Sequence, residues 1–260
     1  MAAKDFLLLT IVVLLINFLF NLLISKSEKN RKAYLVIALI LNVLLLSTFK
    51  YWKVVLDQLL VLNNTYTWNM KFPQIELIIP LGLSYYTFKH IAHLVDVYKG
   101  KIQKVNLFKF TSYILFFPEI TAGPITKPLD YYSQLHTRKY NEYKVGEVGK
   151  LLISAVIKKW VLASYLYMYV KGPFTSPDLY SSTDLIIAMF AYSAMIYCDF
   201  SGYTDLAILV SRLLGFKSTE NFNAPYSATN FKDFWSRWHI SLSSWLRDYV
   251  YIPLGGNRRG

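Results

Sequence analysis

Residues Phe6–Ile24 read FLLLTIVVLLINFLFNLLI and contain no charged side chain. The run is close to the roughly 20 apolar residues that an α-helix needs to cross a bilayer. A cleaved signal peptide is the competing interpretation. Against it, Lys4 is offset by Asp5, no small-residue cleavage site follows, and the basic flank SKSEKNRK comes directly after the run. The stretch therefore predicts the first transmembrane helix of a membrane protein.

The composition of the whole chain favours the same class. Hydrophobic residues make up 54% of the sequence and charged residues only 17%, whereas about a quarter is usual in soluble domains. The net charge of +12 would suit nucleic acid, but no basic cluster lies in a soluble-looking domain. In a membrane protein, such a charge is typical of cytoplasmic loops and of contact with anionic lipid. Cys198 stands alone in an apolar run, which excludes an intrachain disulfide and does not indicate an activated thiol.

Further apolar runs predict further spans: Ala33–Phe49, Ile75–Tyr98, Leu151–Val170, Thr183–Phe200 and, after Ser201-Gly202, Tyr203–Phe216. By the positive-inside rule, the basic link Lys26–Lys32 and the basic stretch Lys99–Lys109 lie in the cytoplasm, which puts the N-terminus outside. Gln58–Pro73 is polar and aromatic, as expected of an external loop. No internal repeat or low-complexity linker is visible, so residues 1–260 are expected to form a single multi-pass domain.

The segment Phe110–Pro128 differs from the other apolar runs. It is short and contains Pro118, Glu119, Gly123 and Pro124, a composition that breaks helices. The stretch that follows, Arg138–Lys150, is basic, like the stretch before it. The segment is therefore expected to enter and leave the membrane by the same face. Irregular backbone at membrane depth is tolerated where it is buried in protein or lines a wet cavity, so Glu119 is predicted to face a cavity.

Residues Phe231–Gly260 read FKDFWSRWHISLSSWLRDYVYIPLGGNRRG. Helical spacing places one apolar stripe along a single helix, formed by Phe231, Phe234, Trp235, Trp238, Leu242, Trp245, Leu246 and Tyr249. His239 lies at the edge of this stripe, where it could meet a polar substrate beside a wall that excludes water. Its ordinary pKa near neutrality makes it the best candidate for a general base. The alternative is an amphipathic helix at the membrane surface, anchored by its tryptophans.

Other ionisable groups at membrane depth have simpler interpretations. His90, His93 and Asp96 share one helical face but lack a fourth ligand, so helix-to-helix hydrogen bonds are favoured over a metal site. Asn17 and Asn21 are placed for the same kind of contact. Lys158 and Lys159 are expected to snorkel towards lipid headgroups. Asp199 and Asp205 flank Ser201-Gly202, where a helix could break. No soluble-enzyme signature such as GxSxG, a Walker loop or GxGxxG is present.

Several stretches resemble, in order, the bacterial alginate O-acetyltransferase branch of the membrane-bound O-acyltransferase superfamily. They are PLGLSYYTFKHIAHLVDVYKG (Pro80–Gly100), ILFFPEITAGPITKP (Ile114–Pro128), IKKWVLASYL (Ile157–Leu166), IYCDFSGYTDLAI (Ile196–Ile208), ENFNAPYSATNFKDFW (Glu220–Trp235) and the terminal FWSRWHISLSSWLRDYVYIPLGGNRRG. The resemblance implies an all-α, polytopic membrane fold with re-entrant segments around a central tunnel. It implies no bound cofactor. It also implies an acyl donor, either acetyl-CoA or an acyl carrier, that approaches from the cytoplasmic side, and an acceptor that approaches from the opposite side.

The resemblance also assigns residues. His239 matches a histidine that lines the tunnel and is the catalytic candidate. Three candidate substrate-binding residues, Trp235, Trp238 and Trp245, would form the tunnel wall. Arg237 and Asp248, together with Arg247, would lie at the cytoplasmic face. Glu119 is the candidate in the re-entrant segment. The principal base of the family belongs to a later Trp-His-Gly element, which this sequence does not contain. The chain is therefore expected to be C-terminally truncated.

The resulting hypothesis is transfer of an acyl group, most simply acetyl, onto a hydroxyl of an extracytoplasmic polysaccharide at the bacterial cell (inner) membrane. An extracytoplasmic acetyltransferase partner could complete the transfer. D-alanyl transfer to teichoic acid is the alternative within the superfamily. A truncated, non-catalytic membrane component is the alternative from another class. A transporter is less favoured, because no inverted repeat is visible.

Overall fold

A computed structural model describes residues 3–67, 70–72, 77–135 and 145–259. Helices and loops account for all of these residues, and none of them lies in a strand. The all-α prediction is therefore confirmed. Contacts divide the chain into two compact units, one of Met1–Phe116 with Lys127–Leu129 and the other of Phe117–Thr126 with Asp130–Gly260. The prediction of a single domain stays a prediction.

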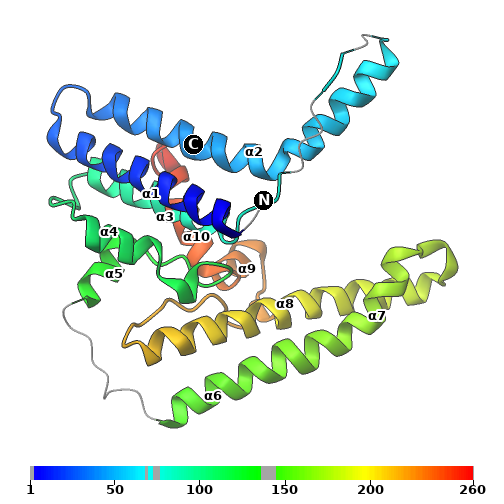
Figure 1. Cartoon of the computed structure of the whole chain (residues 1–260). Helices are drawn as coiled ribbons and strands as arrows, with labels where there is room; N and C mark the ends of the chain where they lie inside the picture. The colour runs from blue at the N-terminus through cyan, green and yellow to red at the C-terminus, as the bar shows by residue number, and fades with distance from the viewer. Residues whose placement is uncertain (1–2, 68–69, 73–76, 136–144, 260) are drawn as a thin grey trace. The chain divides into compact units, whose positions relative to one another are not determined.

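The first unit is built from α1 (Ala3–Lys26), α2 (Arg31–Thr65), α3 (Leu83–Tyr98) and α4 (Leu107–Ile114) (Figure 1). Helix α3 is its centre, since every residue from Lys89 to Val97 is buried. α3 is shorter than the predicted span and begins after Pro80 and Gly82, whose φ is 74°. α2 is longer than predicted and continues through Gln58 to Thr65, so this part of the expected external loop is helical.

Polar contacts join the helices of the first unit. Asn42 Nδ2 donates to Asn17 Oδ1 at 2.7 Å, and His93 Nδ1 lies 2.8 Å from Asn21 Oδ1. The predicted contacts of Asn17 and Asn21 with neighbouring helices are therefore present. At the C-terminal end of α3, the Arg31 guanidinium donates to the carbonyl oxygens of Val97 and Tyr98, at 3.3 and 2.8 Å. The turn between α1 and α2 and the end of α3 thus lie together, as the predicted cytoplasmic placement of both requires.

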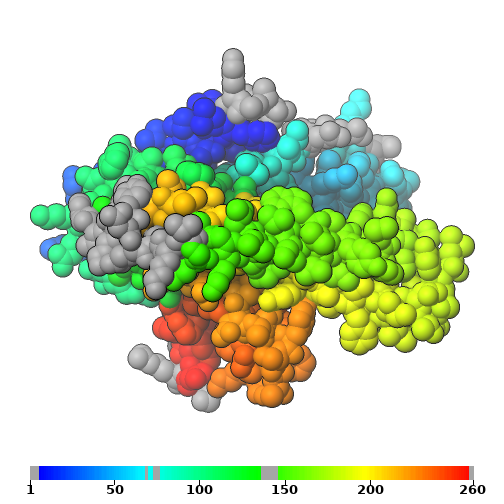
Figure 2. All heavy atoms as spheres, turned by 90° about the horizontal axis from the view of Figure 1, so that it is seen from below, coloured from blue at the N-terminus to red at the C-terminus, as the bar shows by residue number. Residues whose placement is uncertain are grey.

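The second unit contains one long helical rod packed along another (Figure 1). The first rod is α6 (Val145–Val156), the π-helical η2 (Ile157–Leu162) and α7 (Ala163–Thr175); the second is α8 (Ser182–Leu213). Figure 2 shows the atoms of these elements, green to yellow, side by side. The remaining elements are η1 (Phe117–Glu119), α5 (Pro128–Gln134), η3 (Pro177–Leu179), η4 (Pro225–Ser227), α9 (Phe231–Arg237), α10 (Ile240–Leu246), η5 (Arg247–Tyr251) and η6 (Gly256–Arg259).

Helix α8 corrects one prediction and supplies partners for two lysines. It runs without a break through Ser201-Gly202, because the glycine serves close packing: a Cβ on Gly202 would lie 2.9 Å from the backbone nitrogen of Lys159. The lysines of η2 have partners in α8, and their expected reach towards lipid headgroups stays a prediction. Lys158 Nζ lies 2.9 Å from Asp205 Oδ2 and Lys159 Nζ lies 2.6 Å from Asp199 Oδ1, so each ion pair joins η2 to α8.

Within the part of the chain that the structure describes, four helical stretches are long and apolar enough to cross a membrane: Phe6–Lys26, Arg31–Thr65, Gly146–Thr175 and Ser182–Leu213. Large apolar side chains are widely exposed along them, for example Leu8 at 63%, Met168 at 73% and Phe190 at 71%. Such surfaces suit lipid rather than water. The membrane class predicted from composition is confirmed. The predicted basic stretch at 138–150 lies partly outside the described residues.

Candidate functional site

The surroundings of His239 are a set of aromatic rings drawn from α8, the loop after it, and α9. The aromatic wall comprises Tyr197, Phe200, Phe222, Tyr226, Phe234 and Trp238. Phe200 meets His239 edge to face, with ring centroids 4.8 Å apart. The Phe222 ring lies 5.1 Å from both Phe200 and Trp238, and Trp238 stacks on Phe234 at 5.6 Å. Edge-to-face and stacked pairs at these distances are favourable beyond their apolar burial, so the wall is a stable feature.

The backbone at His239 departs from the predicted continuous helix. α9 ends at Arg237, Trp238 is extended (φ −100°, ψ 128°), and His239 is left-handed at φ 43° and ψ 53° before α10 begins. The single amphipathic helix is therefore wrong. The break lets the loop after α8 bind both helix ends: Asn223 N donates to Arg237 O at the end of α9, and Ile240 N donates to Asn221 O at the start of α10, each at 3.0 Å. Ser241 N donates to the Asn221 side-chain oxygen at 3.1 Å.

The half-buried His239 imidazole has one ring nitrogen without a hydrogen-bond partner among the described residues. This nitrogen, Nδ1, is buried. Burial among aromatic rings lowers the pKa of His239 to about 4, because a charged imidazolium is poorly solvated there. At neutral pH the ring is uncharged, so it can accept a proton or a hydrogen bond through one nitrogen and donate through the other.

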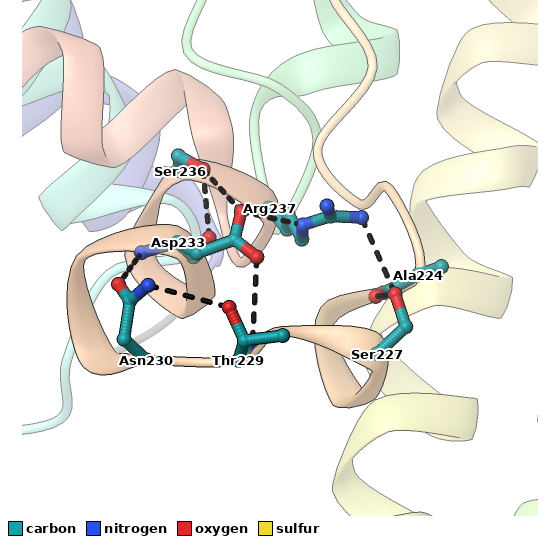
Figure 3. Close-up of polar contacts among 7 residues, drawn as sticks. All are labelled: Ala224, Ser227, Thr229, Asn230, Asp233, Ser236 and Arg237. Atoms are coloured by element: carbon teal, nitrogen blue, oxygen red, sulfur yellow. Dashed lines mark hydrogen bonds and ion pairs between the residues drawn. The ribbon is translucent and has the colours of Figure 1, made fainter.

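Arg237, the last residue of α9, joins a polar network with residues at the start of that helix (Figure 3). Its Nε donates to Asp233 Oδ1 at 2.7 Å, and its Nη1 reaches Ser227 Oγ at 3.3 Å. Asn230 caps the helix by accepting from Asp233 N at 2.8 Å. The bond from Arg237 keeps the pKa of Asp233 below its usual value. Arg237 therefore braces the loop that carries the aromatic wall, and its predicted role in substrate binding stays a prediction.

The three tryptophans do not share one wall. Trp238 belongs to the aromatic wall beside His239, whereas Trp235 is 55% exposed and touches Phe234 at 5.5 Å. Trp245 is 3% exposed, and its ring packs on Tyr249 at 5.6 Å. The helical break separates these positions, which a continuous stripe would have aligned. At the end of α10, Arg247 Nε donates to Asp248 Oδ1 at 2.8 Å, so the two pair with each other.

Glu119 lies in irregular backbone, as predicted, and is 1% exposed. Its Oε1 accepts from Thr126 Oγ1 at 2.6 Å and from Ser218 Oγ at 3.0 Å. A Cβ on Gly123 would lie 2.6 Å from Glu119 Cα, so only glycine fits this turn. The same loop reaches α10, because Ile125 N donates to Ser241 Oγ at 2.9 Å. The loop thus supports the helix that begins directly after His239. Re-entry into a membrane stays a prediction.

No group of three or more His, Cys, Asp or Glu side chains able to hold a metal occurs within residues 3–67, 70–72, 77–135 and 145–259. His93 is engaged with Asn21, which agrees with the helix-to-helix interpretation. His90 and His93 belong to the first unit and His239 to the second. The candidate site therefore rests on His239 and its aromatic wall.

The family model of the membrane-bound O-acyltransferases matches residues 5–260. The chain belongs to this family. A protein of Pseudomonas aeruginosa named "probable alginate O-acetylase" is 34% identical over 258 residues, which cover 98% of this chain and 49% of that protein. A peptidoglycan O-acetyltransferase of Helicobacter pylori is 33% identical, covering 93% of this chain and 51% of its own length.

A more partial match is the teichoic acid D-alanyltransferase of Bacillus subtilis, 35% identical over 69% of this chain and 47% of its own. The chain thus spans about half the length of the curated relatives it matches. The acetyltransferases match almost the whole of this membrane-bound O-acyltransferase chain, and the D-alanyltransferase matches about two thirds of it.

Several residues of the candidate site were not predicted from the sequence. They are Tyr197, Phe200, Phe222 and Tyr226 of the aromatic wall and Asn221, which holds the start of α10. The spacing of Tyr197 and Phe200, three residues apart on a helix, was a usable signal for a shared face. The loop residues carried no periodic signal, because their placement depends on hydrogen bonds to a distant helix.

Proposed function

We propose that this chain carries one part of a membrane O-acyltransferase site that transfers an acyl group, most simply acetyl, onto a hydroxyl of an extracytoplasmic polysaccharide. The observation that carries the proposal is the neutral, half-buried His239, whose Nδ1 has no partner and whose ring is held against Phe200. Relatives named as O-acetyl-transferring enzymes of alginate and peptidoglycan match nearly the whole chain, which supports the substrate class.

His239 is proposed to orient the reacting hydroxyl and to help remove its proton. A hydrogen bond from the hydroxyl to a neutral imidazole raises the nucleophilicity of the oxygen without placing a charge among the rings. The pKa of about 4 makes the imidazole a weak base at neutral pH, so a second, stronger base would complete the proton transfer. The aromatic wall keeps water away and strengthens hydrogen bonds within it.

The proposed co-substrate is an acyl thioester, acetyl-CoA or an acyl carrier, that approaches from the cytoplasmic side; no bound cofactor is required. Trp235, Trp238, Trp245, Arg237, Asp248 and Glu119 remain the proposed substrate-binding residues. An extracytoplasmic acetyltransferase is the proposed partner. D-alanyl transfer to teichoic acid is the second candidate, because the B. subtilis teichoic acid D-alanyltransferase is 35% identical over 69% of the chain.

The test is acyl transfer from a radiolabelled donor by the complete gene product in membranes. His239→Asn keeps the left-handed backbone, which asparagine tolerates, and is expected to lower turnover on the order of 10²-fold. Lys232→Ala on the exposed side of α9 is the matched control and should keep turnover. Equal turnover of wild type and His239→Asn would remove His239 from the mechanism. Labelling with D-alanine instead of acetate would select the second candidate.

A further inference from the structure

A second feature of the second unit lies beside the aromatic wall: a partly enclosed polar cavity of about 180 Å³. It lies between η2, α8 and the loop after α8, and its lining includes Lys158, Ser201, Thr204, Asp205, Asn221 and Phe222. A water molecule takes roughly 30 Å³ in the liquid, so the cavity has room for several. Its polar lining makes it unlike the dry apolar voids of protein cores.

Three lining side chains lack partners for their polar atoms. Ser201 Oγ, Thr204 Oγ1 and Asn221 Nδ2 have no hydrogen-bond partner among the described residues. Their side chains are 1%, 2% and 1% exposed, so outside solvent does not satisfy them directly. A buried polar atom left without a partner costs on the order of 1–3 kcal/mol. A ligand that both donates and accepts hydrogen bonds, such as water in the cavity, removes this cost.

The charges at the cavity require the same solvation. Asp205 Oδ2 accepts from Lys158 Nζ at 2.9 Å and from Ser154 Oγ at 2.7 Å. Both partners lie on helices able to span a membrane. An ion pair away from water is held at a large desolvation cost, which water molecules beside it reduce. Hydration of the cavity therefore explains how this pair is kept within the rods.

The cavity has an entrance on its polar side. Arg212 and Glu220 line both the cavity and an open groove of about 670 Å³. The rest of that groove is polar and includes Ser133, Gln134 and Lys217. Glu220 and Lys217 are exposed. Solution can thus reach the cavity past a mouth formed by one basic and one acidic side chain.

Two aromatic rings also line the cavity. Phe222 and Tyr197 line the cavity, and the Phe222 ring lies 5.1 Å from Phe200. Phe200 in turn meets His239 at 4.8 Å. Phe222 is therefore the ring between the polar cavity and the residue that touches His239.

We propose that the cavity is a water-binding inlet and that Phe222 is a specificity-determining residue that closes this inlet off from His239. The hydration of the inlet stands alone, whereas the role of Phe222 rests on the proposed function. Water that passed Phe222 would attack the acyl thioester: its oxygen would bond to the carbonyl carbon, the carbon–sulfur bond would break, and a proton would pass to the thiolate. The products would be a free acid and a thiol instead of an acylated hydroxyl.

The inlet is tested by cysteine labelling, without any need for activity. In a Cys198→Ala background, Ser201→Cys and Thr204→Cys are treated with a small charged methanethiosulfonate, which reacts with water-exposed thiolates. We expect them to react faster on the order of tenfold than Ala188→Cys, which is equally buried on α8 but lines no described cavity. Adding Glu220→Trp at the mouth should slow Ser201→Cys. Equal rates at the three cysteines would overturn the inlet.

The barrier is tested by the ratio of donor hydrolysis to acyl transfer in the complete gene product. Phe222→Ala should raise this ratio several-fold, whereas Phe222→Leu, which keeps apolar bulk, should not. Phe231→Ala is the matched control, because Phe231 is 86% exposed and belongs neither to the aromatic wall nor to the cavity lining. An unchanged ratio in Phe222→Ala, with transfer intact in wild type, would overturn the barrier. Absence of transfer in wild type would overturn the proposed function and the barrier with it, and would leave the labelling result standing.

Discussion

At the scale of single residues, His239 combines an unusual backbone with an unusual environment. A non-glycine residue at positive φ is uncommon and marks a position that the surrounding structure determines. At φ 43°, His239 is held there by the loop that binds the start of α10. Such strain at a residue whose ring has an unsatisfied nitrogen agrees with a role in chemistry rather than in packing alone.

The lowered pKa of His239 predicts a pH dependence of stability. The unfolded chain binds a proton at His239 near pH 6.5, whereas the folded chain binds it only near pH 4. Between these values the unfolded state holds the extra proton, so stability falls as the pH falls from 6.5 to 4. His239→Asn should lessen this loss, as measured by thermal unfolding in detergent from pH 7.5 to 4.5. His239→Gly should behave like the asparagine variant, and parallel pH profiles of all three proteins would contradict the assignment.

The sequence pattern indicated His239 as a candidate but did not predict the backbone break beside it, and the reason is physical. The repeat of apolar residues from Phe231 to Tyr249 fits one helix, and local propensity offers no cause for a break. The break depends on Asn221, which bonds to Ile240 and Ser241 across the fold. A hydrogen bond between residues about 20 apart in the chain leaves no mark on helical periodicity.

At the scale of elements, the pairing of η2 with α8 shows how ionisable groups are accommodated. Lys158 and Lys159 are consecutive, and Asp199 and Asp205 lie at equal distances before and after Gly202. Each lysine reaches one aspartate, and the glycine between them lets the π-helical turn approach the α8 backbone. The sequence indicated that these charges were unusual at membrane depth. It did not indicate which lysine pairs with which aspartate, because the pairing depends on how the two rods pack.

Gly202 is therefore predicted to be essential to this pairing. In Gly202→Ala the new Cβ would lie 2.9 Å from Lys159 N and 3.1 Å from Ala155 O. These are backbone atoms that cannot rotate away, so we expect a loss of about 1–3 kcal/mol of stability. Gly149→Ala on α6 is the control, because its Cβ meets nothing within 4 Å, and it should stabilise the helix by up to about 1 kcal/mol. Unfolding in mixed micelles measures the stability change of both variants. Equal changes would show that helix propensity alone, and not the close packing at Gly202, sets the effect of the alanine.

At the scale of the whole molecule, composition was a good guide to class and a weaker guide to span number. Apolar runs long enough to cross a bilayer became the long helices α1, α2 and α8 and the rod of α6 to α7. The run Ile75–Tyr98 instead became the short, buried α3. Composition does not separate a lipid-facing helix from one buried in protein, because both contain long runs rich in apolar residues.

The orientation of the first unit gives the last prediction. Arg31 binds the carbonyl oxygens of Val97 and Tyr98, so the α1–α2 turn and the segment after α3 must lie on one side. The positive-inside rule makes that side cytoplasmic. In a Cys198→Ala background, an impermeant maleimide should label Asn64→Cys, at the exposed end of α2, in intact cells. It should label Glu28→Cys and Lys104→Cys only after permeabilisation. Labelling of these two positions from opposite sides would contradict the Arg31 contact. Labelling of both from outside would agree with the contact but reverse the orientation. The contact fixes which helix ends lie together, and only the lysine-rich loops fix which side of the membrane they face.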